Sequence, residues 1–172
     1  AATKKSAELM SHCYSHLYGL PATGLRFFTV YGAWGRPDMA YYSFTEAVLR
    51  GEPIRVFNHG DMKRDFTYID DVVAGVLAAV EHPPEARGGA APHVVYNIGN
   101  NRPEDLMHFI AVIEAAVGRK ADIRMAPMQP GDVKETYADI TAIRRDLGFV
   151  PSTPIEVGIP RFVEWFRAYH QI

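Results

Sequence analysis

Two spacings of apolar residues alternate along the chain and predict helices that alternate with short strands. Apolar side chains three and four positions apart in residues 2–18 predict an amphipathic helix that Gly19 and Pro21 end. Further helices are expected at residues 41–50, 72–81, 103–117, 140–147 and 155–169. Asp70 or Asp71 is expected to cap the helix at 72–81, because a carboxylate accepts hydrogen bonds from first-turn amides. Strands are expected at residues 23–31, 54–57, 93–98 and 123–125, with a loop at 82–92.

The strand at 23–31 runs directly into a loop. Its apolar residues fit a strand that is covered on both faces, as in parallel sheets: Leu25, Phe27, Phe28, Val30 and Tyr31. Gly32, Gly35 and Pro37 prevent the strand from continuing. Thr29 and Arg36 therefore lie at or just past its carboxyl end, where open α/β sheets bind ligands. The alternative is a core strand followed by a solvated turn.

Composition and charge argue against several classes of partner. At 172 residues the chain has the length of about one domain and can bury a substantial core. Its net charge of −2 gives no reason to expect nucleic acid or an anionic membrane as a partner. The single Cys13 excludes an internal disulfide and suits a reducing compartment, and no apolar stretch approaches the roughly 20 residues that span a bilayer. We therefore expect a soluble, cytoplasmic protein.

Three motifs carry a family resemblance over nearly the whole chain. Residues 26–39 contain RFFTVYG followed by GRPDM, residues 58–71 read NHGDMKRDFTYIDD, and residues 129–139 read QPGDVKETYAD. With these motifs in this order, the chain resembles the C-terminal half of an extended short-chain dehydrogenase/reductase of the NAD-dependent epimerase/dehydratase family. The motifs are most similar to those of the UDP-glucuronate 4-epimerases.

The resemblance implies an α/β fold with partial Rossmann-type (doubly wound) sheet elements plus the smaller α/β substrate-binding domain of these enzymes. About 1–31 and 93–98 would be Rossmann-sheet elements, and about 32–92 and 99–172 would be mainly substrate domain. The glycine-rich turn that binds a pyrophosphate in the first βαβ unit is not found, and Gly88-Gly89 does not make one. We infer that the N-terminal NAD-binding half is absent and that the chain is a fragment.

The first residues match the catalytic motif of the family in part. That motif is a tyrosine followed four residues later by a lysine, and in AATKK the lysine is Lys4 while the tyrosine would precede Ala1. Residues four apart share a helix face, so the ammonium group lowers the pKa of the phenol, and the phenolate can accept a sugar hydroxyl proton. The resemblance makes Lys4 a catalytic and NAD-binding residue. Taken alone, Lys4 is an exposed lysine near a helix start.

The resemblance also assigns binding roles to residues that have simpler explanations. Phe27 would line the nicotinamide of NAD and Phe28 the sugar, although both are core residues by default. Arg64 would bind the diphosphate with its planar fork of donors, the alternative being an exposed charge cluster. Asp132 would hold the nucleotide ribose, the alternative being a turn residue after Pro-Gly. Val56 would meet the uracil through its backbone.

Thr29 and Arg36 indicate the substrate. Relatives that act on neutral sugars usually have Asn at the Thr29 position, whereas Thr29 with Arg36 suits a sugar carboxylate. Oxidation at C4 of a glucuronosyl group gives a β-keto acid that tends to lose carbon dioxide. An epimerase therefore has to hold that carboxylate firmly, and a charged hydrogen-bonding pair can do this.

The intact protein is thus expected to catalyse NAD-dependent 4-epimerisation of a UDP-hexuronic acid (UDP-glucuronate/UDP-galacturonate) through a 4-keto intermediate, in polysaccharide biosynthesis. Hydride passes from C4 to NAD and returns to the other face, so the cofactor stays bound. The alternatives are another nucleotide-sugar dehydratase, decarboxylase or epimerase of the family, or a non-catalytic nucleotide-sugar-binding fragment. The chain alone is expected to be inactive.

The helix at 2–18 is expected to form a homodimer. In the family this helix belongs to a four-helix interface, so Met10, Tyr14 and Leu17 would pack against a second subunit; burial within the chain is the alternative. His12 and His16 lie four apart on this helix, but no Glu accompanies them in an H-E-x-x-H arrangement. We therefore expect no metal.

Overall fold

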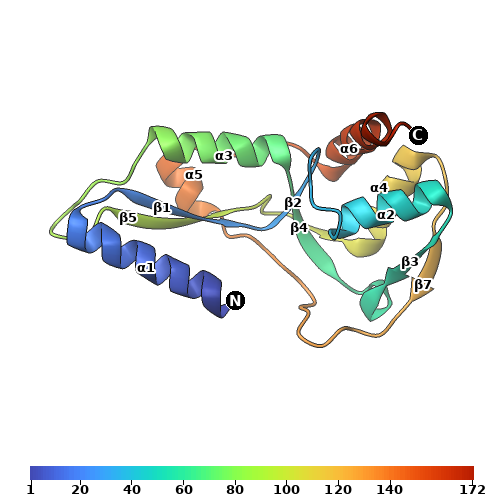
Figure 1. Ribbon diagram of the computed structural model, residues 1–172, viewed down its shortest axis with the longest axis horizontal. Coiled ribbons are helices and arrows are strands. Elements are labelled where there is room, and N and C mark those ends of the chain that lie inside the picture. Colours follow the sequence, from blue (N-terminus) through green and yellow to red (C-terminus); the bar gives the residue numbers. More distant parts are fainter.

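The computed structural model describes residues 1–172, which form two groups of helices and strands arranged along one long axis (Figure 1). The helices are α1 (Ala2–Tyr18), α2 (Ala40–Arg50), α3 (Ile69–Glu81), α4 (Leu106–Val117), α5 (Thr141–Leu147), α6 (Ile155–His170) and the 3-10 helix η1 (Phe57–Gly60). The strands are β1 (Ala22–Phe27), β2 (Thr29–Tyr31), β3 (Pro53–Val56), β4 (Lys63–Tyr68), β5 (His93–Ile98), β6 (Pro103–Asp105) and β7 (Asp122–Met125). None of the helices has the length and apolar character needed to cross a membrane.

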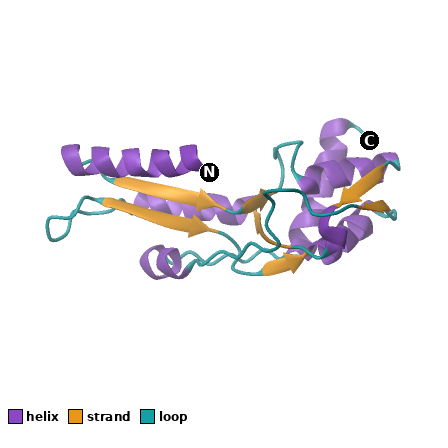
Figure 2. Ribbon diagram, turned by 90° about the horizontal axis from the view of Figure 1, so that it is seen from below, coloured by secondary structure: helices purple, strands orange, loops and turns teal.

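The first group is built on the parallel pair β1 and β5, which align from Ala22 with His93 to Phe27 with Ile98. Successive side chains of a strand point to opposite faces of a sheet. One face is covered by α3, α5 and the residues that flank α5. The buried side chains on this side form one cluster: Val72, Tyr96, Ile98, Ala138, Ile140, Ile143 and Phe149. The other face meets α1, where the ring centroids of His12 and His93 lie 5.0 Å apart. Helices on both faces of the pair (Figure 2) confirm the doubly wound sheet elements expected from the sequence.

The second group contains the larger core. Strand β4 is the middle strand of a three-stranded sheet, parallel to β2 and antiparallel to β6, while β3 and β7 form a separate parallel pair. Helices α2, α4 and α6 enclose the core, and the rings of Phe66 on β4 and Phe109 on α4 stack with centroids 3.9 Å apart. The largest buried aromatic residues are Tyr31, Tyr41, Phe66, Phe109, Phe162 and Phe166.

A buried carboxylate, Asp65 on β4, joins the two groups. It accepts hydrogen bonds from the backbone N–H groups of Asn100, at 2.5 Å, and Ala138, at 3.0 Å. Asn100 follows β5, and Ala138 belongs to the buried cluster of the first group. A fully buried carboxylate is stable only when such donors replace water, so Asp65 fixes the position of β4 against the β1 and β5 pair.

The predicted capping of the helix at 72–81 is wrong. Helix α3 begins at Ile69, with Tyr68 in the N-cap position and no side-chain cap hydrogen bond. Asp70 and Asp71 lie within its first turn. The carboxylate of Asp71 instead accepts a hydrogen bond from the backbone N–H of Thr153 at 2.9 Å. The helix begins three residues earlier than predicted, so Asp71 lies inside the first turn and not at the N-cap. Its carboxylate therefore joins α3 to the segment before α6.

The structure differs from the sequence prediction in three places. The strand predicted at 23–31 is interrupted at Phe28, where the chain leaves β5 and continues as β2 beside β4. The helix predicted from residue 103 begins at Leu106, because residues 103–105 pair with β4 as β6. The sequence does not predict β4, whose first three residues are the charged Lys63, Arg64 and Asp65. The other elements are confirmed, with boundaries within three residues of those predicted.

Candidate functional site

Three adjoining cavities run from α1 to β4. We call them the α1 cavity, of about 560 Å³, the loop cavity, of about 400 Å³, and the β4 cavity, of about 220 Å³. Phe27 lines both of the first two, and Met39 and Tyr41 line both of the last two. Seven residues with predicted site roles line these cavities, in the order Lys4, Phe27, Phe28, Arg36, Thr29, Arg64 and Asp132.

The α1 cavity lies between α1 and β1 and is lined by Lys4 and Phe27. The Phe27 side chain is 52% exposed, so its ring is open to a ligand. Glu8 also lines this cavity, but its carboxylate accepts hydrogen bonds from Arg26, with Nε at 2.6 Å, and from Lys5 Nζ at 3.0 Å. These two cations, Arg26 foremost, hold the pKa of Glu8 at about 2. The Glu8 carboxylate is thus paired with Arg26 and Lys5 and does not neutralise Lys4.

The loop cavity lies under the loop of residues 32–39, between β2 and α2. Two glycines set the course of this loop: Gly32 adopts a φ of 141°, and a Cβ on Gly35 would collide with the Tyr41 hydroxyl. The Arg36 side chain is 74% exposed, with Nη2 3.3 Å from Asp38 Oδ2. An exposed ion pair of this kind contributes little free energy. A bound anion can therefore replace Asp38 as the partner of Arg36.

Thr29 and Arg36 do not lie in one cavity. Thr29 pairs with Phe66 on β4 and lines the β4 cavity, whereas Arg36 lines the loop cavity. No hydrogen bond joins the two side chains, and Met39 and Tyr41 form the wall that both cavities share. A ligand has to extend through both cavities in order to contact both residues.

The β4 cavity brings together Arg64 and Asp132, which are far apart in the sequence. Arg64 Nη2 donates to Asp132 Oδ1 at 2.8 Å, and Nη1 donates to the carbonyl oxygens of Lys63 at 2.8 Å and Lys134 at 3.1 Å. The Arg64 side chain is only 18% exposed. The backbone N–H of Val133 also donates to Asp132 Oδ1 at 2.8 Å. Both charged groups are therefore held in fixed positions at the cavity wall.

Val56 is the one predicted site residue that lines none of these cavities. Its side chain is fully buried, and its carbonyl accepts a hydrogen bond from the N–H of Ala126 at 2.8 Å. Its neighbours Arg55 and Phe57 line the β4 cavity instead, with the Arg55 guanidinium 5.2 Å from the Phe57 ring centroid. Strand alternation is the signal that identifies them, because residues next to a buried Val56 point the other way. Backbone contact of Val56 with a uracil stays a prediction.

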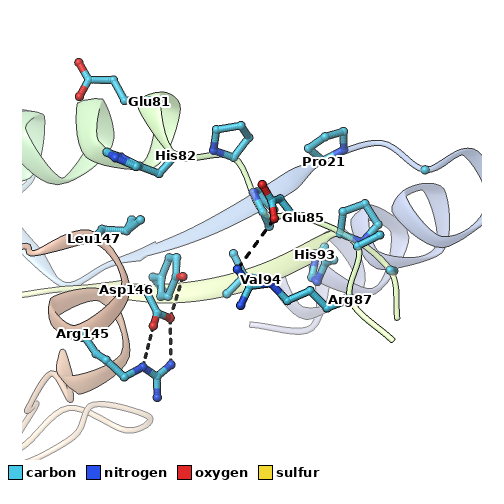
Figure 3. A pocket seen from close by; sticks show the side chains of 17 residues that line it. Pro21, Glu81, His82, Glu85, Arg87, His93, Val94, Arg145, Asp146 and Leu147 are labelled. Carbon is cyan, nitrogen blue, oxygen red and sulfur yellow. Dashed lines mark hydrogen bonds and ion pairs between the residues drawn. The ribbon is translucent and has the colours of Figure 1, made fainter. Parts of the chain in front are cut away.

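A larger hollow of about 930 Å³ is lined by the end of α3, the loop that follows it and residues of α5 (Figure 3), and it shares His93 with the α1 cavity. Its cations are already paired with carboxylates: Arg145 Nε donates to Asp146 Oδ1 at 2.6 Å, and Arg87 lies 3.9 Å from Glu85. The hydrogen bonds from Arg145 lower the pKa of Asp146. None of the predicted site residues lines this hollow. We therefore place the candidate site in the three smaller cavities.

The chain is similar in sequence to proteins about twice its length. It is 51% identical to an uncharacterized 37.6 kDa protein of Escherichia coli O111:H-, a match that covers 100% of this chain and 55% of that protein. It is 47% identical to a probable UDP-glucuronate 4-epimerase of Rhizobium meliloti, over 96% of this chain and 52% of that protein. The chain thus spans about half the length of the curated relatives it matches.

A solved structure and a family model agree with these relatives. The crystal structure of UDP-glucuronic acid 4-epimerase from Bacillus cereus, in complex with UDP-glucuronic acid and NAD, superposes with a TM-score of 0.87 at 32% identity. The match covers 98% of this chain and 52% of that chain. The model of the NAD dependent epimerase/dehydratase family matches residues 1–99, which is more than half of the chain. The chain therefore belongs to the NAD dependent epimerase/dehydratase family.

Proposed function

We propose that this chain forms the C-terminal half of an enzyme that interconverts UDP-glucuronate and UDP-galacturonate at C4, with NAD as cofactor and a 4-keto sugar as intermediate. The observation that supports this most directly is the β4 cavity, where Arg64 and Asp132 meet at 2.8 Å. The names of relatives at 47% and 32% identity support the same assignment.

The order of the cavities matches the order of chemical groups in a UDP-sugar. The β4 cavity would hold the ribose at Asp132 and the diphosphate at Arg64, since a guanidinium contacts two phosphate oxygens at once. The sugar would extend into the loop cavity, beside Phe28 and Arg36. Its reacting carbon would then lie near Phe27, where the loop cavity adjoins the α1 cavity.

The residues of the α1 cavity fit the nicotinamide end of NAD. Lys4 offers a cation that Glu8 does not neutralise, and Phe27 offers an exposed ring. The glycine-rich turn that would hold the pyrophosphate is not among the residues of this chain. When bound, NAD supplies a hydride acceptor for C4 that returns the hydride to the opposite face. Lys4 would lower the pKa of a phenol one helical turn before it, which takes the 4-hydroxyl proton.

Arg36 is the residue that we propose recognises the sugar acid. Its exposed pairing with Asp38 leaves the guanidinium available to the substrate carboxylate. Holding that carboxylate in place restrains the β-keto acid from losing carbon dioxide while C4 is oxidised. Thr29 would meet the same ligand from the neighbouring β4 cavity.

Nucleotide-sugar binding without chemistry is the second candidate function. It is favoured by the Arg64 and Asp132 pair, which is complete within the β4 cavity and lies in a different cavity from Lys4. Binding and catalysis can therefore be separated by experiment.

We also propose that the protein is a cytoplasmic homodimer. Met10, Tyr14 and Leu17 on α1 are each at least 60% exposed, so this apolar face is open to a second subunit. Cys13 on the same helix is an exposed thiol, which suits a reducing compartment.

The proposed nucleotide site is tested by titrating UDP into the chain in a calorimeter. Arg64→Gln is expected to weaken UDP binding by about tenfold to a hundredfold, because a charge-assisted hydrogen bond is lost, whereas uridine binding changes little. Arg124→Gln is the matched control, since Arg124 is exposed, pairs with Asp122 and lies outside the three cavities. Equal UDP affinity for Arg64→Gln and the unaltered chain would exclude the β4 cavity as the nucleotide site.

A further inference from the structure

The loop that carries Arg36 has little internal support. Within residues 32–39, the Met39 N–H donates to the Arg36 carbonyl at 3.2 Å. The Arg36 guanidinium forms an ion pair with Asp38 and donates a hydrogen bond to the Met39 sulfur at 3.4 Å, both of them residues of the same loop. Met39 is the N-cap residue of α2, so these contacts tie Arg36 to its own loop and to the start of α2.

Trp34 connects this loop to the C-terminal helix. Its side chain is 76% exposed, yet its ring centroid lies 5.4 Å from that of Trp165 and 5.2 Å from that of Tyr169, both on α6. Tilted and edge-on contacts at such distances are favourable arrangements for aromatic rings. Trp34 also lines the loop cavity, so one residue touches both the candidate site and α6.

The α6 surface that receives Trp34 is itself well anchored. Trp165 and Tyr169 stack with centroids 5.1 Å apart and an angle of 16° between their planes. On the other side of α6, Phe162 and Phe166 are buried in the larger core. Close to its end, His170 Nε2 lies 2.7 Å from the Tyr42 hydroxyl of α2. Helix α6 is thus a fixed support for the loop.

The backbone of Trp34 indicates that the contact is specific. Its φ is 61°, in the left-handed region that bulky residues rarely adopt unless the surroundings hold them there. Tyr41 restricts the same loop from the α2 side, because its hydroxyl occupies the space that a Cβ on Gly35 would need. The loop is therefore held between α2 and the rings of Trp165 and Tyr169 on α6.

We propose that Trp34, Trp165 and Tyr169, which we call the aromatic clamp, are positioning residues that keep Arg36 directed toward the loop cavity. The clamp would set the preference of the enzyme for a sugar acid over a neutral sugar. This consequence rests on the proposed function, whereas the clamp itself is defined by the ring contacts alone.

The first experiment tests the clamp without substrate. The chain has two tryptophans and both belong to the clamp, so we expect an exciton couplet in the far-ultraviolet circular dichroism that Trp34→Phe and Trp165→Phe each abolish. Hydrogen exchange of the Met39 amide, which is hydrogen-bonded to the Arg36 carbonyl, should become faster in Tyr169→Ala, while exchange of β4 stays unchanged. Tyr137→Ala is the matched control, because Tyr137 is 55% exposed, lies between β7 and α5, and lines none of the three cavities. Absence of the couplet in the unaltered chain, or unchanged exchange in Tyr169→Ala, would overturn the clamp.

The second experiment tests positioning in the complete protein that contains this chain. Tyr169→Ala is expected to weaken binding of UDP-glucuronate by about threefold to thirtyfold and binding of UDP-glucose by less than about twofold. A similar loss for both sugars would show a general structural role and overturn the positioning of Arg36. If the unaltered protein does not prefer UDP-glucuronate, the proposed function fails, and hydrogen exchange still decides whether the clamp holds the loop.

Discussion

Single residues around the cavities differ in how firmly their partners already hold them. Arg64 is fixed by one carboxylate and two carbonyl groups and is largely covered, whereas Arg36 has one exposed carboxylate partner on its own loop. A fixed guanidinium forms part of the wall whether or not a ligand is bound. A loosely paired guanidinium can change partners when the ligand arrives. Substrate selection is therefore expected to depend more on Arg36 than on Arg64.

Replacing Arg36 tests this assignment in the complete enzyme. Arg36→Ala would remove the proposed charge-assisted hydrogen bond to the sugar carboxylate, typically about 1.5–3 kcal/mol, or about tenfold to more than a hundredfold in UDP-glucuronate binding. UDP-glucose has no carboxylate and should lose nothing comparable. Arg36→Lys keeps the charge without the planar fork and should fall between the two. Equal losses for both sugar nucleotides would make Arg36 a structural loop residue.

Glu8 provides a prediction about pH. Hydrogen bonds from Arg26, and to a lesser extent from Lys5, lower its pKa in the folded chain from 4.5 to about 2. Because the folded pKa is the lower one, the stabilisation by Glu8 is present above pH 4.5 and is lost as the pH falls toward 2. In Arg26→Ala the pKa of Glu8 should rise toward 4.5, as followed by NMR titration of its carboxyl carbon. Lys5→Ala should produce a smaller rise, and the opposite order would contradict the assignment.

The sequence identifies seven of the residues that line the candidate site, because they stand in motifs with fixed order. Lys4, Arg64 and Asp132 are examples, and the fold brings the last two into contact. The contact of Trp34 with α6 leaves no such signal, since the two segments are remote in the sequence and neither spacing nor periodicity links them. Thr29 and Arg36 show the converse. They are close in sequence and were expected to act together, but the structure places them in two neighbouring cavities.

At the scale of elements, local periodicity predicts helices better than strands. Helix α1 has one apolar spacing throughout and is confirmed from Ala2 to Tyr18. Strand β4 begins with three charged residues and still occupies the middle of its sheet, because Asp65 receives buried donors and Arg64 turns to Asp132. Strand β6 exists only because β4 lies beside it. Partners distant in sequence decide such strands, so a local pattern misses them.

The buried carboxylate of Asp65 predicts a large loss of stability. Asp65→Ala would leave the N–H groups of Asn100 and Ala138 without their acceptor, at about 1–3 kcal/mol each. We expect the free energy of unfolding in urea to fall by about 2–5 kcal/mol. Asp61→Ala is the control, because Asp61 is an exposed partner of Lys134, and such pairs contribute about 1 kcal/mol or less. If Asp65→Ala lowers the free energy of unfolding no more than the control does, Asp65 does not hold the two groups of elements together.

On the scale of the whole molecule, the candidate site depends on both groups of elements. The α1 cavity belongs to the first group and the β4 cavity to the second. The loop cavity is lined by residues of β1 and β2, the strands through which the chain passes from one group to the other (Figure 1). Asp65 and Asp71 join the groups on either side of this region. A change in the angle between the groups would therefore alter the distance from Lys4 to Arg64. In the proposed function, the substrate and the nicotinamide would have to fit along this distance.

The proposed site needs parts that residues 1–172 do not contain, so this chain alone and the joined protein should differ in activity. Residues 1–172 contain Lys4 but neither the tyrosine that it would activate nor a glycine-rich turn for a pyrophosphate. We expect this chain to bind UDP-glucuronate through the β4 and loop cavities without epimerising it, even with added NAD. Joined to an N-terminal half that supplies both parts, it should convert UDP-glucuronate to UDP-galacturonate, measured by chromatography of the two sugar nucleotides.

Lys4→Met in the joined protein should abolish conversion while preserving UDP binding, because Lys4 lies in the α1 cavity, separate from Arg64 and Asp132. Turnover by residues 1–172 alone would show that the proton acceptor lies within this chain, and the proposed role of Lys4 would be wrong.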